Sequence, residues 1–320
     1  MATVENFRES LGGYRLDLEL KNVPIGFVNG LRRVALSELP VVVLTNVQIL
    51  DNNTQLTHEM IRHRVEMLPI NVLPEQTAVL RDTRVELRYL PPSSDASREE
   101  RIITTDQFQI AGPTGDIILK DRDLEEPLYF MTLGPNESLH IRATLGIDPR
   151  GSHVSVSTFF NHIDPDRAKL DKDTWIGQNG DPREFDNFHI QRSYARDDNG
   201  RPYWFDVSIE SVGVLKAREI LKRSVEVIQN KIAEWVKSPI ARHGEGWYSM
   251  ETEGETFTLG QLVQELMYAG GQAEFVSRDI GHPLLPKLYI RFSTKLQPEA
   301  VVERVRVEAL ALCESILKSL

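Results

Sequence analysis

The segment HEMIRHRVEMLPI, residues 58–70, brings together the residue types of a zinc hydrolase. In the helical motif H-E-x-x-H, two histidines four residues apart bind zinc from one face, and the glutamate acts as general base. His58 and His63 are five residues apart, which is about 500° around a helix, so their imidazoles diverge by about 140°. Arg62 would also place a cation beside the metal. We therefore interpret the segment as a structural helix with polar anchor residues.

Two acidic segments could bind hard cations, but neither has the pattern of an established site. Asp181, Glu184 and Asp186 cluster within residues 179–187, where Gly, Pro and Asn predict a solvated loop. Residues 171–181 lack the glycine that a calcium loop requires. The sequence also contains no glycine-rich phosphate loop and no nucleophile elbow. We therefore expect no catalytic residue, no cofactor and no metal; a hydrolase would need zinc on the two histidines above.

A pair of arginines has a different character. Arg32 and Arg33 lie about 100° and 200° from Leu31 around a helix axis, and they bracket Leu36 at about 140°. Such a face is either a solvated basic surface or a protein contact. Arginine around an exposed leucine is typical of protein interfaces, where Arg is enriched and Lys is depleted.

The elements that would position these residues begin with a strand and a helix. Tyr14 to Leu20 alternates apolar and polar residues like a half-buried strand, and an amphipathic helix follows Pro24. Residues 41–50 are β-branched and predict another strand. From about residue 71 to 160, short strands separated by turn clusters predict a mostly β insert. Residues 161–202 are polar and rich in Asp, Asn, Gly and Pro, which predicts an extended loop.

Regular structure resumes with a predicted strand at 203–213 and a long helix after it. The helix has an apolar stripe of Leu221, Val225, Ile228, Ile232 and Trp235. Residues 238–246 form the predicted linker. Thr258 and Gln261 then predict a capping box at the start of the next helix, and strands are expected near 273–279 and 287–293. The last helix has a stripe of Val301, Val305, Ala309, Leu312, Ile316 and Leu320.

This order contains a recurrence. A strand, a short helix and a long amphipathic helix occur once around the insert, in 14–70 plus 203–237, and again without it in 247–320. Each long helix has a nearly pure apolar stripe and needs a partner surface, and the natural partner is the other helix. The predicted fold class is α+β, with two related units packed face to face within one chain.

Bulk composition narrows the functional classes. The chain has 320 residues, a net charge of −10 and one cysteine, Cys313, so intrachain disulfides and thiolate zinc clusters are excluded. The acidic balance argues against general nucleic-acid affinity. No apolar run approaches the roughly 20 residues that cross a bilayer, and the first residues lack the pattern of a signal peptide. We expect an intracellular protein that does not associate with membranes.

Several stretches together resemble the alpha-like subunits of multisubunit DNA-directed RNA polymerases. NVPIGFVNGLRRVALSELPVVVLTNVQILDNNT, followed by THEMIRHRVEMLPI, resembles the signature of the third subunit of eukaryotic polymerase II and of the archaeal D subunit. LGPNESLHIRATLGIDPRGSHVSVSTFFNHIDPD and YWFDVSIESVGVLKAREILKRSVEVIQNKI resemble further parts of that family. ETFTLGQLVQEL and IGHPLLPKLYIRFST resemble the eleventh subunit and the archaeal L subunit. The chain therefore resembles a fusion of two subunits, which is a feature of polymerases from large DNA viruses.

The resemblance implies a non-catalytic assembly platform for transcription. Its expected partners are the largest and second-largest polymerase subunits and small adaptor subunits, with DNA approached only through the complex. An isolated chain should be monomeric, and its location would be the virion, or the host cytoplasm or nucleus. The alternative is a stand-alone interaction scaffold that keeps the fold without polymerase membership. Many relatives carry a cysteine-rich metal module in the insert, which this chain lacks the cysteines to form.

The resemblance also implies domains and contact residues. The first dimerisation domain covers 1–70 and 203–237, the insert 71–202, the linker 238–246 and the second dimerisation domain 247–320. The expected interface with the second-largest subunit consists of Arg32, Arg33, Leu36, His58, Glu59, His63 and Arg64. The expected contact between the two dimerisation domains consists of Leu221, Val225, Ile228, Ile232, Leu259, Leu262, Val305, Leu312 and Ile316.

Overall fold

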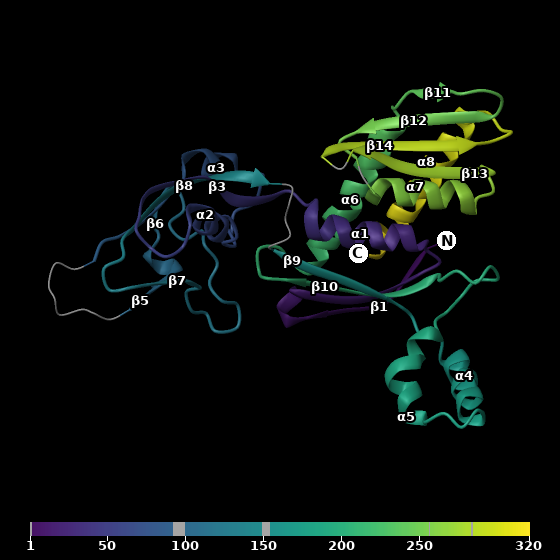
Figure 1. Cartoon of the computed structure of the whole chain (residues 1–320), viewed down its shortest axis with the longest axis horizontal. Helices are drawn as coiled ribbons and strands as arrows, with labels where there is room; N and C mark the ends of the chain where they lie inside the picture. The colour runs from purple at the N-terminus through teal and green to yellow at the C-terminus, as the bar shows by residue number, and fades with distance from the viewer. Residues whose placement is uncertain (1, 92–99, 149–153, 256, 283) are drawn as a thin grey trace. The chain divides into compact units, whose positions relative to one another are not determined.

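A computed structural model describes residues 2–91, 100–148, 154–255, 257–282 and 284–320. The chain forms two compact units (Figure 1). The first comprises residues 1–35, 156–210 and 217–320, and the second comprises 36–155 and 211–216. Both combine helices with antiparallel sheets. In the described part of the chain, no helix is both long and apolar enough to cross a membrane.

One sheet of the first unit has the strand order β1-β2-β10-β9. These strands are β1 (Thr3–Ser10), β2 (Arg15–Lys21), β9 (Ser155–Asn161) and β10 (Trp204–Ser211). Burial alternates along both β2 and β10, and between Phe205 and Glu210 of β10 the buried residues are apolar and the more exposed ones polar. The sheet therefore has one apolar face for packing and one polar face, as the alternation in the sequence predicts.

Two helices pack beside this sheet. α1 (Ile25–Ser37) follows Pro24, and α6 (Ala217–Trp235) contacts β2. The stripe predicted for α6 is buried along its whole length, ending with Trp235 fully enclosed. Burying such a stripe is the main source of stability for a helix of this length.

The first unit contains a second sheet with the order β11-β12-β14-β13. Its elements are β11 (Ile240–Arg242), β12 (Trp247–Glu253), α7 (Phe257–Ala269), β13 (Phe275–His282), β14 (Leu285–Ser293) and α8 (Pro298–Ser319). Figure 1 shows α1 and α7 between the two sheets, and α8 contacts α6, α7 and β1. β11 lies inside the predicted linker 238–246, so this segment joins the sheet by pairing with β12.

The capping box predicted at Thr258 and Gln261 is wrong. α7 begins at Phe257, so Thr258 lies inside the helix. Its hydroxyl accepts a hydrogen bond from Arg33 in α1, and Gln261 accepts one from Asn29. The side chains of Thr258 and Gln261 therefore bind α1, which is distant in the sequence, instead of the local backbone N–H groups that a capping box would bind.

The extended loop predicted at 161–202 is also wrong. α4 (Pro165–Gly177) occupies much of it, followed by a short α5 (Pro182–Glu184), a π-helical turn (Phe185–His189) and a 3₁₀ turn (Ile190–Arg192). Asp164 caps α4, accepting from the backbone N–H groups of Asp166 and Arg167, and proline holds the first helical position. The start signal was present in the sequence, but α4 buries no residue and so has no apolar stripe.

The second unit is built on a sheet with the order β3-β8-β4-β6. These strands are β3 (Val41–Asn52), β4 (Arg84–Tyr89), β6 (Gln109–Ala111) and β8 (Leu139–Asp148), and a smaller sheet pairs β5 (Arg101–Thr104) with β7 (Tyr129–Leu133). α2 (His58–Glu66), α3 (Thr77–Asp82) and a 3₁₀ turn (Thr105–Gln107) complete the unit.

This unit begins at Leu36, whereas the predicted insert begins at residue 71. β3 pairs with β8 along nearly its full length, and α2 supplies Ile61 and Val65 to the same core. The chain order alone does not reveal such pairings, because β3 and β8 are separated by nearly a hundred residues.

Candidate assembly interface

A polar seam joins α1 to α7 within the first unit. The backbone N–H of Gly26 donates to Glu265 Oε2 at 2.6 Å, and Asn29 Nδ2 donates to Gln261 Oε1 at 3.3 Å. Arg33 Nε donates to Thr258 Oγ1 at 2.9 Å. The residue numbers rise on α1 as they fall on α7, so the two helices run antiparallel across the seam.

Glu265 acts as a cap for a helix from which it is remote in sequence. Its carboxylate accepts hydrogen bonds from the N–H groups of Gly26 and Ile25, at the N-terminus of α1. A helix N-terminus has unsatisfied N–H groups and favours a negative charge. Burial nevertheless raises the pKa of Glu265 above its usual range, and the backbone hydrogen bonds offset only part of that rise.

The two glycines of α1 differ in how closely α7 approaches them. A Cβ on Gly26 would lie 2.3 Å from Glu265 Oε2, and one on Gly30 would lie 3.7 Å from both Ile228 and Thr258. A Cβ at position 30 would therefore have ordinary contact distances, whereas a Cβ at position 26 would displace the Glu265 carboxylate from its present position. A glycine inside a helix costs about 1 kcal/mol relative to alanine, and this contact explains the one at position 26.

Apolar and ionic contacts extend this interface. α6 contacts α8, and Lys231 Nζ in α6 binds both oxygens of Glu255 at 2.8 and 2.9 Å. The predicted dimerisation residues that are buried are Leu221, Val225, Ile228, Ile232, Leu259, Leu262, Val305 and Ile316. Leu312 is only half-buried, and Cys313 beside it is fully enclosed. The buried stripe of α8 therefore passes through Cys313 in place of Leu312 and returns to the predicted position at Ile316.

The predicted contact residues of α1 differ in their surroundings. Arg32 is half-buried and its guanidinium donates twice to Asn29 Oδ1, at 3.2 and 3.1 Å. Arg33 belongs to the seam described above. Leu36 is half-buried and lies at the start of the second unit. The described hydrogen bonds of Arg32 therefore stay within α1, whereas that of Arg33 reaches α7.

The remaining predicted contact residues lie on α2 in the second unit. Thr57 caps this helix by accepting from the N–H of Met60. His58, Glu59, His63 and Arg64 are all exposed. Arg64 Nη1 donates to the carbonyl of Phe130 at 2.7 Å, and Glu59 pairs with Arg62 at 3.0 Å. The two histidines belong to no metal-ligating group among the residues that the structure describes.

Sequence reasoning missed the two methionines of this segment. Met60 and Met67 are 51% and 42% exposed, and they lie near each other on one helix and its C-cap rather than scattered singly over the surface. With His63 and Arg64 they occur at positions i, i+3, i+4 and i+7, which form one face of a helix. We call these four residues the α2 face. The helical spacing of Met60 and Met67 is visible in the sequence, but it indicates exposure only once Ile61 and Val65 are known to be the buried positions.

The acidic segments considered for cation binding have structural roles. Asp181 accepts from the N–H of Arg183 at the start of α5, and Asp186 pairs with Lys172 at 2.6 Å. Glu184 lies 3.9 Å from His189. These contacts connect α4 to the turns that follow it.

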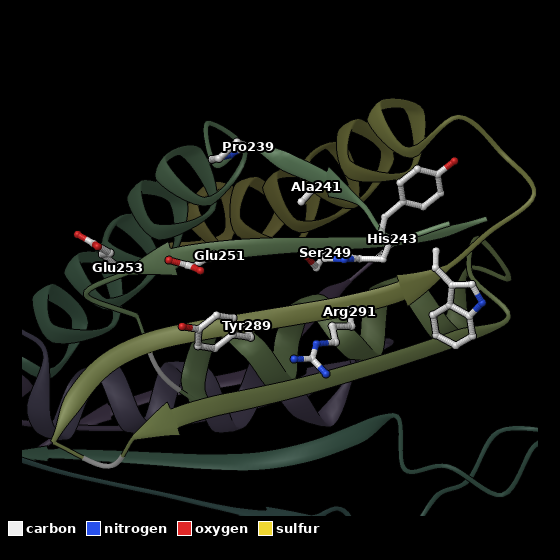
Figure 2. A pocket seen from close by; sticks show the side chains of 10 residues that line it. Pro239, Ala241, His243, Ser249, Glu251, Glu253, Tyr289 and Arg291 are labelled. Atoms are coloured by element: carbon white, nitrogen blue, oxygen red, sulfur yellow. Dashed lines mark hydrogen bonds between the residues drawn. The ribbon is translucent and has the colours of Figure 1, made fainter. Parts of the chain in front are cut away.

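The outer face of the second sheet carries an open depression of about 860 Å³. Figure 2 shows Tyr289 and Arg291 of β14 beside Ser249 and Glu251 of β12. His243 Nε2 lies 2.6 Å from Ser249 Oγ, which resembles part of a nucleophilic pair. A catalytic histidine also needs a group that orients it, and the described hydrogen bond of this imidazole is the one to Ser249. The pair on its own does not provide a catalytic site.

The chain is similar to known proteins over much of its length. Residues 17–232 match the RNA polymerase Rpb3/Rpb11 dimerisation domain family. The RNA polymerase II subunit RPB3 of Schizosaccharomyces pombe is 26% identical over 254 residues, 69% of this chain and 82% of that subunit. The RNA polymerase subunit Rpo3 of Pyrobaculum aerophilum is 41% identical over 84 residues, 26% of this chain and 27% of that subunit. For Rpo3 of Aeropyrum pernix, identity is 26% over 42% of the chain, about half the length of that relative. The matched range spans more than half of the sequence, and the chain therefore belongs to the Rpb3/Rpb11 dimerisation domain family.

Proposed function

We propose that this chain is a non-catalytic assembly subunit of a multisubunit DNA-directed RNA polymerase. The relatives compared above are polymerase subunits, and the family match, residues 17–232, covers residues on both sides of the second unit. In this proposal, residues 247–320 act as an eleventh-subunit-like partner fused to a third-subunit-like part, as in the polymerases of large DNA viruses. The two parts form a pseudo-heterodimer within one chain.

The observation that carries this proposal is the contact of α1 and α6 with α7 and α8. Each pair comes from one of the two recurrent parts, and polar and apolar contacts join them. Apolar helical stripes of this kind are what a dimerisation domain buries. The chain thus satisfies internally the surface that a separate subunit would need a partner to cover.

The proposed contact with the second-largest subunit uses Arg32 and Leu36 together with the α2 face. Arginine and methionine are enriched in protein interfaces. The α2 face contains both, with Arg64 between the exposed Met60 and Met67. His58 and Glu59 would lie at its edge. Arg33 is assigned here to the contact inside the chain as well, because its guanidinium binds Thr258. The largest subunit and small adaptor subunits would bind elsewhere, including the segment 161–202.

The test is recovery of tagged full-length chain with polymerase subunits, quantified by mass spectrometry. The wild-type chain should recover the two large subunits in equal amounts. Met60→Asp should reduce recovery of the second-largest subunit at least about tenfold, because a charge would be buried unpaired at an interface. Leu124→Asp is the matched control, since Leu124 is an exposed apolar residue of the same unit. Equal recovery with both variants would remove the α2 face from the interface.

A second variant separates the arginines. Arg32→Glu should also weaken recovery, and it should lower the unfolding midpoint of the isolated chain less than Arg33→Glu, because the hydrogen bonds it removes lie within α1. Arg33→Glu should lower that midpoint as well, because it removes a seam hydrogen bond. If the chain recovers neither large subunit in any form, the alternative holds and it is a stand-alone scaffold with the alpha-like fold.

A further inference from the structure

A cluster of metal-ligating side chains lies on the polar face of the sheet β1-β2-β10-β9. Glu19 of β2, Asp206 of β10 and His162, which directly follows β9, place one ligand atom each within 4.8 Å of the others. All three residues are half-buried. The cluster lies wholly within the first unit.

The register of the sheet concentrates negative charge at this point. Asp206 lies directly opposite Glu19 on one side, and Glu5 of β1 lies directly opposite Glu19 on the other. Like charges facing each other across strands are destabilising. A bound cation would remove this repulsion.

Neighbouring groups hold Glu19 and His162 in position. Asn6 Nδ2 donates to Glu19 Oε1 at 2.7 Å, and Trp204 Nε1 donates to Glu19 Oε2 at 3.0 Å. The imidazole of His162 stacks on the indole of Trp204, with centroids 3.9 Å apart and planes 16° from parallel. Each carboxylate oxygen keeps a further lone pair for a metal, and supporting contacts of this kind orient metal ligands in established sites.

We propose that Glu19, His162 and Asp206 bind one divalent transition-metal ion, with Zn²⁺ as the best fit. An imidazole with two carboxylates suits zinc, whereas magnesium prefers oxygen ligands alone. Bonds of about 2.1 Å in a tetrahedral site place ligand atoms roughly 3.4 Å apart, so side-chain rotation over a short distance completes the site. The ion would come between His162 Nδ1 and Asp206 Oδ1, now 2.7 Å apart, and water would occupy the fourth position.

Such an ion would connect the two ends of the segment that contains α4. His162 lies where the chain leaves the sheet toward α4, and Asp206 lies on the strand by which it returns. The ion would therefore fix the base of residues 163–203 to β2. Zinc should slow proteolysis within this segment in proportion to the occupancy of the site.

The experiment is a zinc titration of the chelator-treated full-length chain against a chromophoric competitor. We expect one saturable site per chain, and loss of at least about tenfold in affinity in His162→Ala and in Asp206→Asn. Trp204→Phe, which keeps an aromatic ring but removes the Nε1 donor, should lose a similar factor. His140→Ala is the control, because its imidazole contacts Glu86 in the second unit. Circular dichroism checks that each variant is folded, and Asp206→Asn tests the site should His162→Ala fail to fold.

A second readout uses protection of the segment 163–203 from protease. Zinc should protect it in the wild-type chain and in His140→Ala, and millimolar magnesium should not. Zinc bound with equal affinity by His162→Ala and His140→Ala would be adventitious surface binding and would overturn the proposal. The absence of saturable one-to-one binding by the wild-type chain would overturn it equally.

Discussion

At the scale of single residues, the seam depends on the carboxylate of Glu265, which is partly removed from water and bound by backbone N–H groups instead. Glu265 is half-buried and bonded to the first N–H groups of α1. The residue that permits this approach is Gly26. Both residues therefore have effects that can be measured in the isolated chain.

Gly26→Ala should destabilise the chain by about 1–2 kcal/mol. The new methyl group would displace the carboxylate of Glu265, and the N–H of residue 26 would lose its acceptor in a buried place. Gly177→Ala is the control, because a Cβ at this helical position meets nothing within 4 Å. Urea unfolding followed by circular dichroism measures both. Equal midpoints for the two variants would show that the seam does not need a glycine.

Glu265→Gln should change the pH dependence of stability in a defined direction. Because burial raises the pKa of this carboxyl in the folded chain, the folded state holds its proton more tightly than the unfolded state. The contribution of the Glu265 carboxyl to the free energy of unfolding is therefore complete below its ordinary pKa of 4.5. This contribution is lost as the pH rises through the pKa of the carboxyl in the folded chain. The variant should gain stability relative to the wild type between pH 4 and pH 7. Unfolding free energies that diverge in the opposite direction would contradict this reading.

At the scale of elements, the docking of α8 can be followed through Cys313. This thiol is fully enclosed, and burial raises its pKa to about 12. Thiolate is the reactive form, so iodoacetamide at pH 8 should modify the native chain no faster than α8 opens. The sequence has one cysteine, and mass spectrometry therefore follows this position alone. Modification within minutes in the native state, at the rate seen in urea, would mean that α8 is not packed as described.

Elements could be predicted from the sequence where one buried face gives apolar residues a regular spacing. The stripe of α6 and the alternation of β2 both identified their elements and their buried faces. α4 buries no residue, so its only signal was the cap at Asp164 and the following proline. β11 is short and has only one pairing partner, and its place in the predicted linker reflects that weak signal.

The seam and the zinc cluster were beyond prediction for a different reason. Glu265 and Gly26 are separated by 239 positions, and Glu19 and Asp206 meet only through strand pairing. Local patterns contain no information on such partners. The resemblance to polymerase subunits identified the family, but it placed Arg33 on an outer surface, whereas the structure also gives it a partner in α7.

At the scale of the whole molecule, the proposed pseudo-heterodimer would hold its two recurrent parts together at a fixed and high effective concentration. A short connection of this kind typically supplies an effective concentration in the millimolar range. The helical stripes of α6 and α8 are then covered without a second chain. Self-association should be absent as a consequence.

Light scattering should therefore give the mass of one chain, 36.4 kDa, at all concentrations from micromolar upward. A chain that ends after residue 237 would lack α7 and α8 and would expose Leu221, Val225, Ile228 and Ile232 on α6. Apolar stripes of that size do not remain in water, so this truncated chain should form dimers or larger species. Adding residues 247–320 as a separate polypeptide should return it to a one-to-one complex. A full-length chain that forms an obligate homodimer would mean that α6 and α8 pair between chains, and the pseudo-heterodimer would have to be abandoned.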